Sequence, residues 1–242
     1  LLTASLLAIS CVLSNNVWAE TKKPSKEVEQ EAYATPDYTV KLGTGIDYSI
    51  GKYGQALDTE ILYVPFSAKI ERGNWTAKVT VPWLRISGPS AVLGGGDGGG
   101  VVVAGGATST TNSGLGDVVA ALTYGIDLPE KTFLDLTGKV KAPTGDFAKG
   151  LGTGEPDYTL QADLTKMFGS LSVFGGAGYK FVGTNSALHL KDSVLTNVGV
   201  GYDILPELNS GVTFDWRLSA SRRSNPSEAP VYFNYQVTKL FN

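Results

Sequence analysis

The sequence offers one arrangement of residue types that could support covalent catalysis. His189 is the sole histidine, and Ser186 and Ser193 lie within four residues of it. A histidine base beside a serine nucleophile could hydrolyse a lipid ester. Nothing in the spacing fixes the geometry of these side chains, so an exposed loop histidine is the simpler interpretation. We predict no enzymatic activity and keep a lipid-modifying barrel enzyme as the less favoured alternative.

A second group of candidate residues consists of charged side chains that alternate with apolar ones. In VTFDWRLSA, residues 212–220, every second residue is apolar and the residues between are polar or charged. This period of two indicates a β-strand with one dry and one wet face. The charged residues of such runs that we assign to the lining of an enclosed lumen are Lys139, Asp163, Lys180, Asp203, Asp215 and Arg217. They could select solutes in a polar conduit, or pair with one another and fill a narrow barrel.

A third group is acidic and falls in or beside a long loop. Asp117, Asp146, Glu155 and Asp157 could form an acidic rim at the outer mouth of a barrel. Such a rim would favour cationic or neutral solutes over anions. The nearby glycine runs GGGDGGG and GLGTG imitate phosphate-binding loops, but the strand and helix that such a loop needs do not flank them. With one histidine and one cysteine in the chain, we predict no metal site and no cofactor.

Strands are the elements that must position these residues. Alternating runs fall at residues 38–50, 62–70, 75–83, 118–126, 134–140, 158–164, 171–181, 194–204, 212–220 and 231–241. Each is about long enough to cross a bilayer as a tilted strand. Tight turns such as ERGN and LPEK alternate with long loops, as in bacterial outer-membrane barrels. We therefore predict an all-β fold, a transmembrane antiparallel β-barrel of about ten strands with short periplasmic turns and long outer loops.

Aromatic residues and prolines refine this prediction. Most aromatic residues of the strands alternate in step with the apolar residues, so they belong to the same face. They fall toward the strand ends, as expected of side chains at the two interfaces of a membrane. The apolar residues of each strand should therefore face lipid, and the charged residues that alternate with them should face the lumen. Pro65 and Pro82 lie within predicted strands, and since proline cannot donate to a ladder we expect a bulge or bend at each.

Composition and the N-terminal residues suggest where the protein works. The chain has 242 residues, 42% of them hydrophobic, and a formal net charge of -3, which argues against nucleic-acid binding. We predict a signal peptide at residues 1–19, cleaved after Ala19, with acylation of Cys11 as the less favoured alternative. Residues 20–37 should form a mobile periplasmic segment and residues 38–242 the barrel. The expected location is the bacterial outer membrane, and the expected partners are its lipid, the barrel-assembly machinery and a small-molecule solute.

Three segments resemble a known protein family. They are VPWLRISGP at residues 81–89, SGLGD at 113–117 and KVKAPTGDFAKGLGTGEPDY at 139–158. They are similar to the outer-membrane transporter family named for the meta-pathway of phenol degradation. The resemblance implies a barrel that passes small, often aromatic, compounds, and it carries over no site residues.

The resulting functional prediction is the passage of small molecules, with hydrophobic or aromatic compounds as candidates. Two further interpretations stay open beside the enzyme already named. One is a non-conducting barrel with a structural or partner-binding role. The other is a soluble ligand-binding barrel that keeps its apolar side chains inside.

Overall fold

The computed structural model describes most of the chain as β-sheet. The described residues are 5–14, 38–51, 57–89, 92–94, 100–102, 109–184, 190–205, 208–217, 227–228 and 231–237. The larger strands are β1 (Ser5–Ser14), β2 (Thr39–Gly51), β3 (Thr59–Arg72), β4 (Trp75–Pro89), β8 (Val118–Leu128), β9 (Thr132–Ala142), β10 (Asp157–Phe168), β11 (Leu171–Phe181), β12 (Ser193–Leu205), β13 (Leu208–Arg217) and β15 (Val231–Val237). The smaller elements are β5 (Val92–Gly94), β6 (Gly100–Val102), β7 (Ser109–Leu115), β14 (Ser227–Glu228) and the 3₁₀ helix η1 (Phe147–Lys149).

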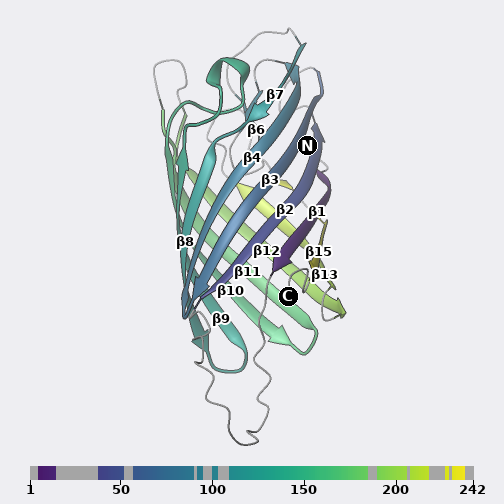
Figure 1. The fold of residues 1–242 in the computed structure, drawn as a ribbon, viewed down its shortest axis with the longest axis vertical. Coiled ribbons are helices and arrows are strands. Elements are labelled where there is room, and N and C mark those ends of the chain that lie inside the picture. Colours follow the sequence, from purple (N-terminus) through teal and green to yellow (C-terminus); the bar gives the residue numbers. More distant parts are fainter. Residues whose placement is uncertain are drawn as a thin grey trace, which may run out of the picture.

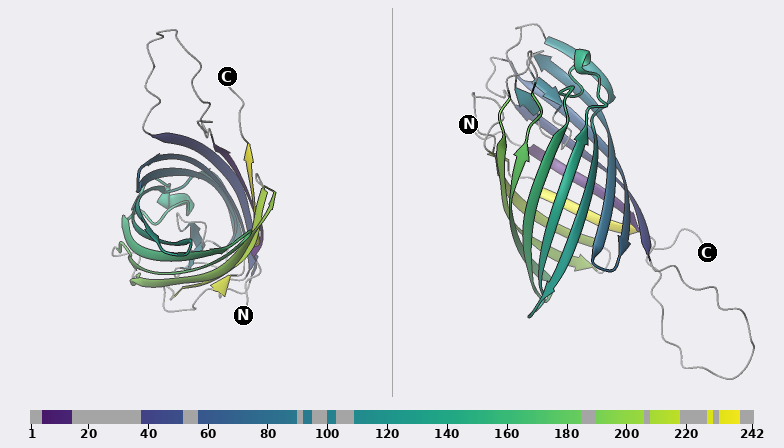
Figure 2. Two further views of the ribbon diagram at one scale, coloured as in Figure 1. Left: turned by 90° about the horizontal axis from the view of Figure 1, so that it is seen from below. Right: turned by 90° about the vertical axis from the view of Figure 1, so that its left-hand side faces the viewer.

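The main sheet closes on itself. Its neighbouring strands run β12, β11, β10, β9, β8, β4, β3, β2, β1, β15 and β13, and β13 pairs back with β12. Figures 1 and 2 show the result as a tilted-strand barrel with an enclosed interior, which we call the lumen. Closure leaves no long sheet edge without a partner. The predicted barrel fold is confirmed, and all ten predicted strands are present, as β2, β3, β4, β8 to β13 and β15.

Strand β1 is an addition to the ten predicted strands. It pairs antiparallel with β2 and parallel with β15, and so fills the seam between the first and last predicted strands. Its residues lie within the predicted signal peptide, residues 1–19. Cleavage after Ala19 stays a prediction.

Connections of two lengths separate the ends of the barrel. Residues 73–74, 129–131 and 169–170 are short links at one end, the short-turn end. Residues 143–156 form a longer link at the opposite end, the long-loop end. This alternation follows the sequence prediction. In the part of the chain that the structure describes, no helix is long and apolar enough to cross a membrane.

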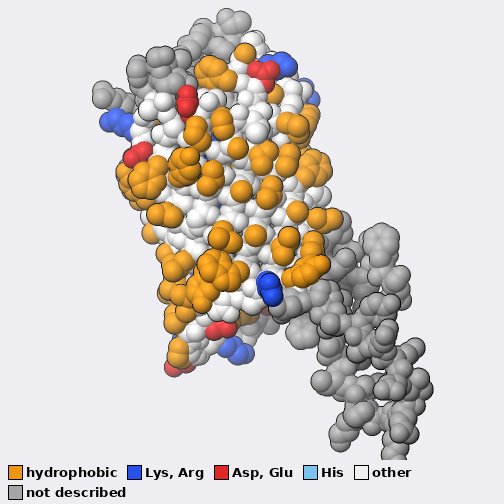
Figure 3. Space-filling view, turned by 60° about the vertical axis from the view of Figure 1, so that its left-hand side comes forward, with side chains coloured by type: hydrophobic (Ala, Val, Ile, Leu, Met, Phe, Trp, Pro, Cys, Tyr) orange, Lys and Arg blue, Asp and Glu red, His pale blue; other side chains and the backbone are white. Residues whose placement is uncertain are grey.

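Side chains of opposite character occupy the two faces of the barrel wall. On β10, Leu160 is 63% exposed and Leu164 is 48% exposed on the exterior, while Gln161 and Asp163 hydrogen-bond to each other inside. Figure 3 shows hydrophobic side chains spread over the middle of one exterior face, with most charged ones toward its two ends. The exterior is therefore apolar and the lumen polar.

The bulge or bend predicted at each proline is found beside Pro82, where the register of β4 shifts between β8 and β7, and not between β3 and β4. Pro65 and Pro82 lie directly opposite each other, and the register between β3 and β4 is continuous around them. Two residues without N–H groups can face each other at a position where antiparallel partners exchange no hydrogen bond. At such a position a backbone N–H would face the strand on the other side, so each proline lacks a donor toward its outer neighbour. The ladder of β4 accordingly breaks between β8 and β7, where Gly116 N–H donates to the Pro82 carbonyl (2.9 Å).

Candidate functional site

The long-loop end of the barrel is covered by residues 143–156, which we call the mouth loop. The loop joins β9 to β10 and contains η1, whose start is capped by the Asp146 carboxylate and whose end is the left-handed Gly150. Seen from below, η1 lies within the outline of the barrel ring (Figure 2). Leu151 is buried against Ile61, Leu84 and Ile86, apolar residues of β3 and β4. The mouth loop therefore folds onto the inner wall.

Five side chains, one from the mouth loop and four from the barrel wall below it, form a buried polar group that we call the mouth cluster: Asp117, Lys141, Thr153, Asp157 and Lys180. Lys141 Nζ lies 3.2 Å from Asp117 Oδ2 and 3.0 Å from Asp157 Oδ2. It also donates to the Thr153 hydroxyl. Lys180 Nζ lies 3.2 Å from the same Asp157 oxygen. Asp117, Lys141 and Asp157 are each less than 5% exposed, so these are ion pairs out of contact with bulk water.

Backbone donors complete the mouth cluster. Asp117 accepts from the N–H groups of Gly145 (2.9 Å) and Thr153 (3.3 Å), both on the mouth loop. Asp157 accepts from the N–H of Gly183, which follows β11 (3.0 Å). Buried carboxylates that are ion-paired and also accept several hydrogen bonds keep their charge at tolerable cost. The cluster thereby ties the mouth loop to the barrel wall.

Two glycines of the mouth loop are required by this close approach. A Cβ on Gly152 would lie 2.3 Å from Asp117 Oδ1, and one on Gly145 would lie 2.5 Å from the Leu151 carbonyl oxygen. Neither distance is possible for a real side chain. The sequence GLGTG, which resembles a phosphate loop, instead lets the backbone come close to a buried carboxylate.

The lumen holds a polar cavity of about 630 Å³ between β3, β4, β8 and β9. It is lined by Lys69, Glu71, Gly73, Asn74, Thr76, Lys78, Ala121, Thr123, Gly125, Asp127, Asp135, Thr137 and Lys139. We call it the lumen cavity. It lies in the part of the barrel toward the short-turn end, since the turn residues 73–74 contribute to its wall. The mouth loop and the lumen cavity thus occupy different levels of one interior.

Residues 54–241 match the model of a protein family described as "Putative MetA-pathway of phenol degradation". The chain belongs to this family. The match spans every strand from β3 to β15, so the resemblance found in the sequence is confirmed. A search of curated proteins finds no match to the chain.

The segments that suggested the MetA-pathway family supply most of the mouth cluster. SGLGD ends at Asp117, and the segment at residues 139–158 contains Lys141, Thr153 and Asp157. The side chains of these four residues meet although Asp117 and Asp157 are far apart in the sequence. In this member of the family the two segments therefore form a single structural unit.

The structure corrects our interpretation of the four acidic residues. All four lie at the long-loop end, but Asp117 and Asp157 are buried and paired with lysines, so they do not form an exposed acidic rim. Asp146 is exposed, and the hydrogen bond from Lys149 lowers the pKa of its carboxyl below the ordinary value. Glu155 is half-buried, and its backbone carbonyl accepts from the Thr153 hydroxyl (3.3 Å).

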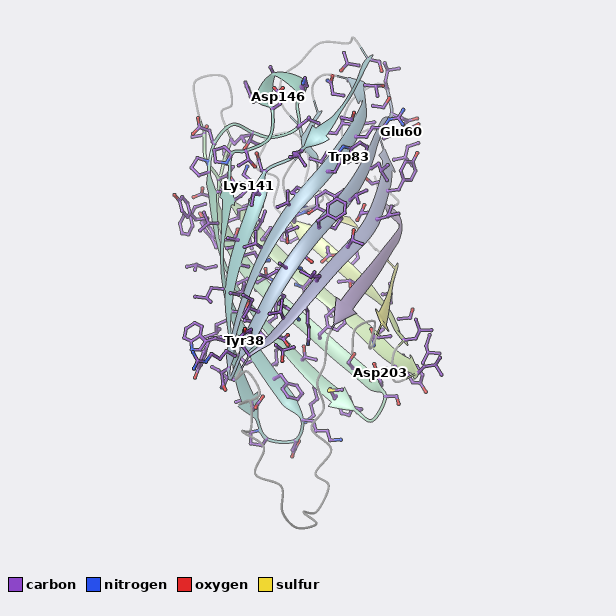
Figure 4. All side chains as sticks on the ribbon, in the orientation of Figure 1. Tyr38, Glu60, Trp83, Lys141, Asp146 and Asp203 are labelled. Atoms are coloured by element: carbon purple, nitrogen blue, oxygen red, sulfur yellow. The ribbon has the colours of Figure 1, made fainter. Side chains whose placement is uncertain are left out.

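The six residues predicted to line the lumen all lie on the inward face of their strands. Lys139 donates to Gln161 (2.8 Å), and Asp163 accepts from Gln161 (2.8 Å) and Asn197 (3.3 Å). Lys180 belongs to the mouth cluster. The other three are Asp203, bonded to Asn209 (2.7 Å) at the short-turn end, and Asp215 and Arg217 on β13. Figure 4 shows Lys141 and Asp203 toward opposite ends of the barrel.

Some positions of interest lie outside the described residues, and others escaped the sequence analysis. His189 and Ser186 are outside the described ranges, while Ser193 is buried at the start of β12. Sequence reasoning missed Lys141, the central cation of the mouth cluster, and Leu151, the apolar anchor of the mouth loop. The alternation of Lys139 and Lys141 could have placed both lysines inside, but only the register between β8 and β9 shows that Asp117 lies beside Lys141.

Proposed function

We propose that this barrel lies in a bacterial outer membrane and lets small molecules pass through its lumen. The observation that carries the proposal is a polar cavity of about 630 Å³ enclosed by a wall with an apolar exterior. In hydrocarbon every backbone donor and acceptor must be satisfied within the protein, and a closed barrel achieves this. An apolar exterior around a polar interior is the arrangement of outer-membrane barrels and the reverse of a soluble ligand-binding barrel.

Aromatic pairs on the exterior support the membrane location. Trp75 and Tyr124 near the short-turn end have ring centroids 4.8 Å apart, and Tyr179 and Phe181 near the long-loop end are likewise 4.8 Å apart. Amphipathic rings favour the two interfaces of a bilayer. The short-turn end would then face the periplasm. Membrane lipid and the barrel-assembly machinery are the partners that this location implies.

The class of solute is proposed from two sources. The family description names phenol degradation, which makes aromatic compounds candidates. The lumen cavity is polar, so such a solute would carry polar or charged groups. We propose no catalytic role for the chain.

The mouth loop favours a second candidate, a non-conducting barrel with a structural or partner-binding role. Leu151 and the mouth cluster fix this loop across the long-loop end. A loop held in this way could close the lumen permanently. The two candidates make opposite predictions for the movement of solutes.

Reconstitution of the full chain separates them. In planar bilayers the first candidate predicts small unitary currents, and in liposome swelling it predicts entry of small polar solutes above a protein-free control. Folded protein that gives neither current nor swelling over many insertions would favour the non-conducting barrel. Heat-dependent migration in gel electrophoresis confirms that the inserted protein is folded.

A further inference from the structure

Lysines of neighbouring strands form a continuous row inside the barrel. Lys41 pairs with Lys69, and Lys69 with Lys78; Lys78 and Lys139 both pair with Ala121 between them. The same row continues through Thr159 to Lys180. Because the strands of a barrel are tilted, a row perpendicular to them climbs from one end toward the other. This row climbs from the short-turn end toward the mouth cluster.

Aspartates form a second row, parallel to the first. From Gly125 it passes through Asp135, Asp163, Gly176, Asn197 and Asp215. A neutral row separates the two and consists of Thr76, Thr123, Thr137 and Gln161. The hydroxyls of Thr123 and Thr137 hydrogen-bond to each other (2.9 Å). On β9, Lys139 and Asp135 are four residues apart, or about 13 Å along the strand.

Most lysines of the first row already have acidic partners. Lys41 and Lys69 each lie 2.7 Å from Glu71, and Lys180 is paired with Asp157. Lys139 donates to the neutral side-chain amide of Gln161. Among the residues that the structure describes, neither Lys78 nor Lys139 has a carboxylate within ion-pair distance, and Asp135 has no cation within that distance.

These three groups all line the lumen cavity, and the carboxylate of Asp127 joins Asp135 at its negative pole. Lys78 and Lys139 flank Ala121, whose small side chain leaves space between them, and Asp135 lies on the other side of the threonine row. Opposite charges that line one low-dielectric cavity create a strong field between them. A solute with a carboxylate at one end and an ammonium group at the other can satisfy both poles at once.

We propose that the lumen cavity binds small zwitterions, with the carboxylate between Lys78 and Lys139 and the ammonium group toward Asp135. The hydroxyls of Thr123 and Thr137, which hydrogen-bond to each other, line the span between these two poles. This inference rests on the proposed function, because it names the class of solute that the lumen handles. It also assigns the selectivity to the cavity wall rather than to the mouth.

Four compounds with one carbon skeleton test the proposal. γ-Aminobutyrate is zwitterionic, butyrate anionic, n-butylamine cationic and butyramide neutral. Calorimetric titration of the full chain in detergent should show γ-aminobutyrate binding at least tenfold more tightly than each of the other three. Equal binding of all four, or no measurable binding of γ-aminobutyrate, would overturn the proposal.

Substitutions at the two poles give separate signatures. Lys78→Gln with Lys139→Gln should lower the affinity for γ-aminobutyrate at least tenfold and remove any binding of butyrate, while n-butylamine is unaffected. Asp135→Asn should lower the affinity for γ-aminobutyrate and n-butylamine but not for butyrate. Lys131→Gln and Glu130→Gln, in the exposed turn 129–131, are the matched controls and should change nothing. An unchanged affinity for γ-aminobutyrate in both pole variants would contradict the proposal.

Flux measurements distinguish failure of this inference from failure of the proposed function. Liposomes that admit all four compounds at the same rate would support passage and contradict the zwitterion site. Tight, pole-dependent binding without any flux would support the site and contradict passage. Lys78→Gln alone serves as a milder variant if the double substitution prevents folding.

Discussion

Lys141 lies between two buried carboxylates and is itself almost inaccessible to water. It contacts Asp117, Thr153 and Asp157, which come from two separate segments of the chain. Removing one partner from a buried ion pair leaves the other charge without compensation. The stability of the long-loop end should therefore depend on this single ammonium group more than on any exposed ion pair.

Substitution of Lys141 by alanine measures that dependence. We expect Lys141→Ala to lower the free energy of unfolding by about 3–5 kcal/mol, because Asp117 and Asp157 remain buried without their shared cation. Guanidinium titration of the reconstituted barrel is the measurement. The control is Lys149→Ala, which removes the exposed pair with Asp146 (3.2 Å) and should have a much smaller effect, because solvent-exposed ion pairs contribute little to stability. Similar effects of the two substitutions would show that the mouth cluster is not buried.

Gly152→Ala tests the close approach of the mouth loop to Asp117. Its Cβ would lie 2.3 Å from a carboxylate oxygen, so the loop must shift and overpacking should cost about 1–3 kcal/mol. Gly138→Ala is the control, since the nearest atom to its Cβ would be 4.0 Å away. The same guanidinium titration compares the two. Equal stability would mean that the loop backbone does not contact Asp117 as described.

The sequence predicts the face on which a strand residue lies wherever the alternation of apolar and polar residues is enough to decide it. Asp163 and Lys180 were placed inside correctly, because alternation alone fixes the face of a strand residue. Asp117 and Asp157 were misinterpreted as exposed because their common partner, Lys141, lies between them on the neighbouring strand β9. The register that brings these three residues together has no local signal in a single sequence.

At the scale of elements, the mouth loop acts as a cover with two attachments. Leu151 packs on Ile61, Leu84 and Ile86, and the mouth cluster holds the loop backbone from below. The break between β7 and β8 at residues 116–117 brings Asp117 to this point. Thr144 bridges the break, accepting from Val118 N–H (2.9 Å) and donating to the Gly116 carbonyl (3.0 Å).

Shortening the mouth loop should open the long-loop end. Replacement of residues 146–153 by Gly-Ser-Gly removes η1 and Leu151 while it leaves Lys141 and Asp157 in place. We expect the unitary conductance in planar bilayers to rise several-fold, because the obstruction at the mouth is gone. A folded variant with unchanged conductance would show that the loop does not obstruct the lumen.

Strand β1 gives a second prediction at this scale. Cleavage after Ala19 would remove β1 and leave β2 beside β15, which restores an even number of antiparallel strands, as in bacterial single-chain barrels. N-terminal sequencing of protein purified from outer membranes should therefore begin at Glu20. A sequence that retains residues 5–14 would instead make β1 a permanent strand of the barrel.

The strands were predictable from sequence because period-two alternation is a local signal, and all ten were found. The consequences of Pro65 and Pro82 were only partly predictable. A bulge or bend was expected at each proline, but facing prolines need no shared hydrogen bonds, so β3 and β4 stay in register and the break lies between Pro82 and the neighbouring strands β7 and β8. The register between two strands decides which residue of the next strand a proline faces. The alternation of apolar and polar residues in the sequence does not give that register.

For the whole molecule, register turns scattered charges into ordered rows. The lysine row and the aspartate row each cross several strands and could not be seen along the sequence. Their separation by threonines gives the lumen two poles, whereas the exterior face shown in Figure 3 carries little charge between its ends. The central claim is this division of the wall into an apolar exterior and a charged interior.

Site-directed spin labelling of β10 in lipid vesicles tests that division most directly. Single cysteines would be placed at residues 160–165 in a Cys11→Ala background, and collisions with oxygen and with a water-soluble nickel chelate would be measured by electron paramagnetic resonance. The account predicts strict alternation, with labels at 160, 162 and 164 favouring oxygen and labels at 161, 163 and 165 favouring nickel. Loss of the alternation, or its reversal, would contradict the account.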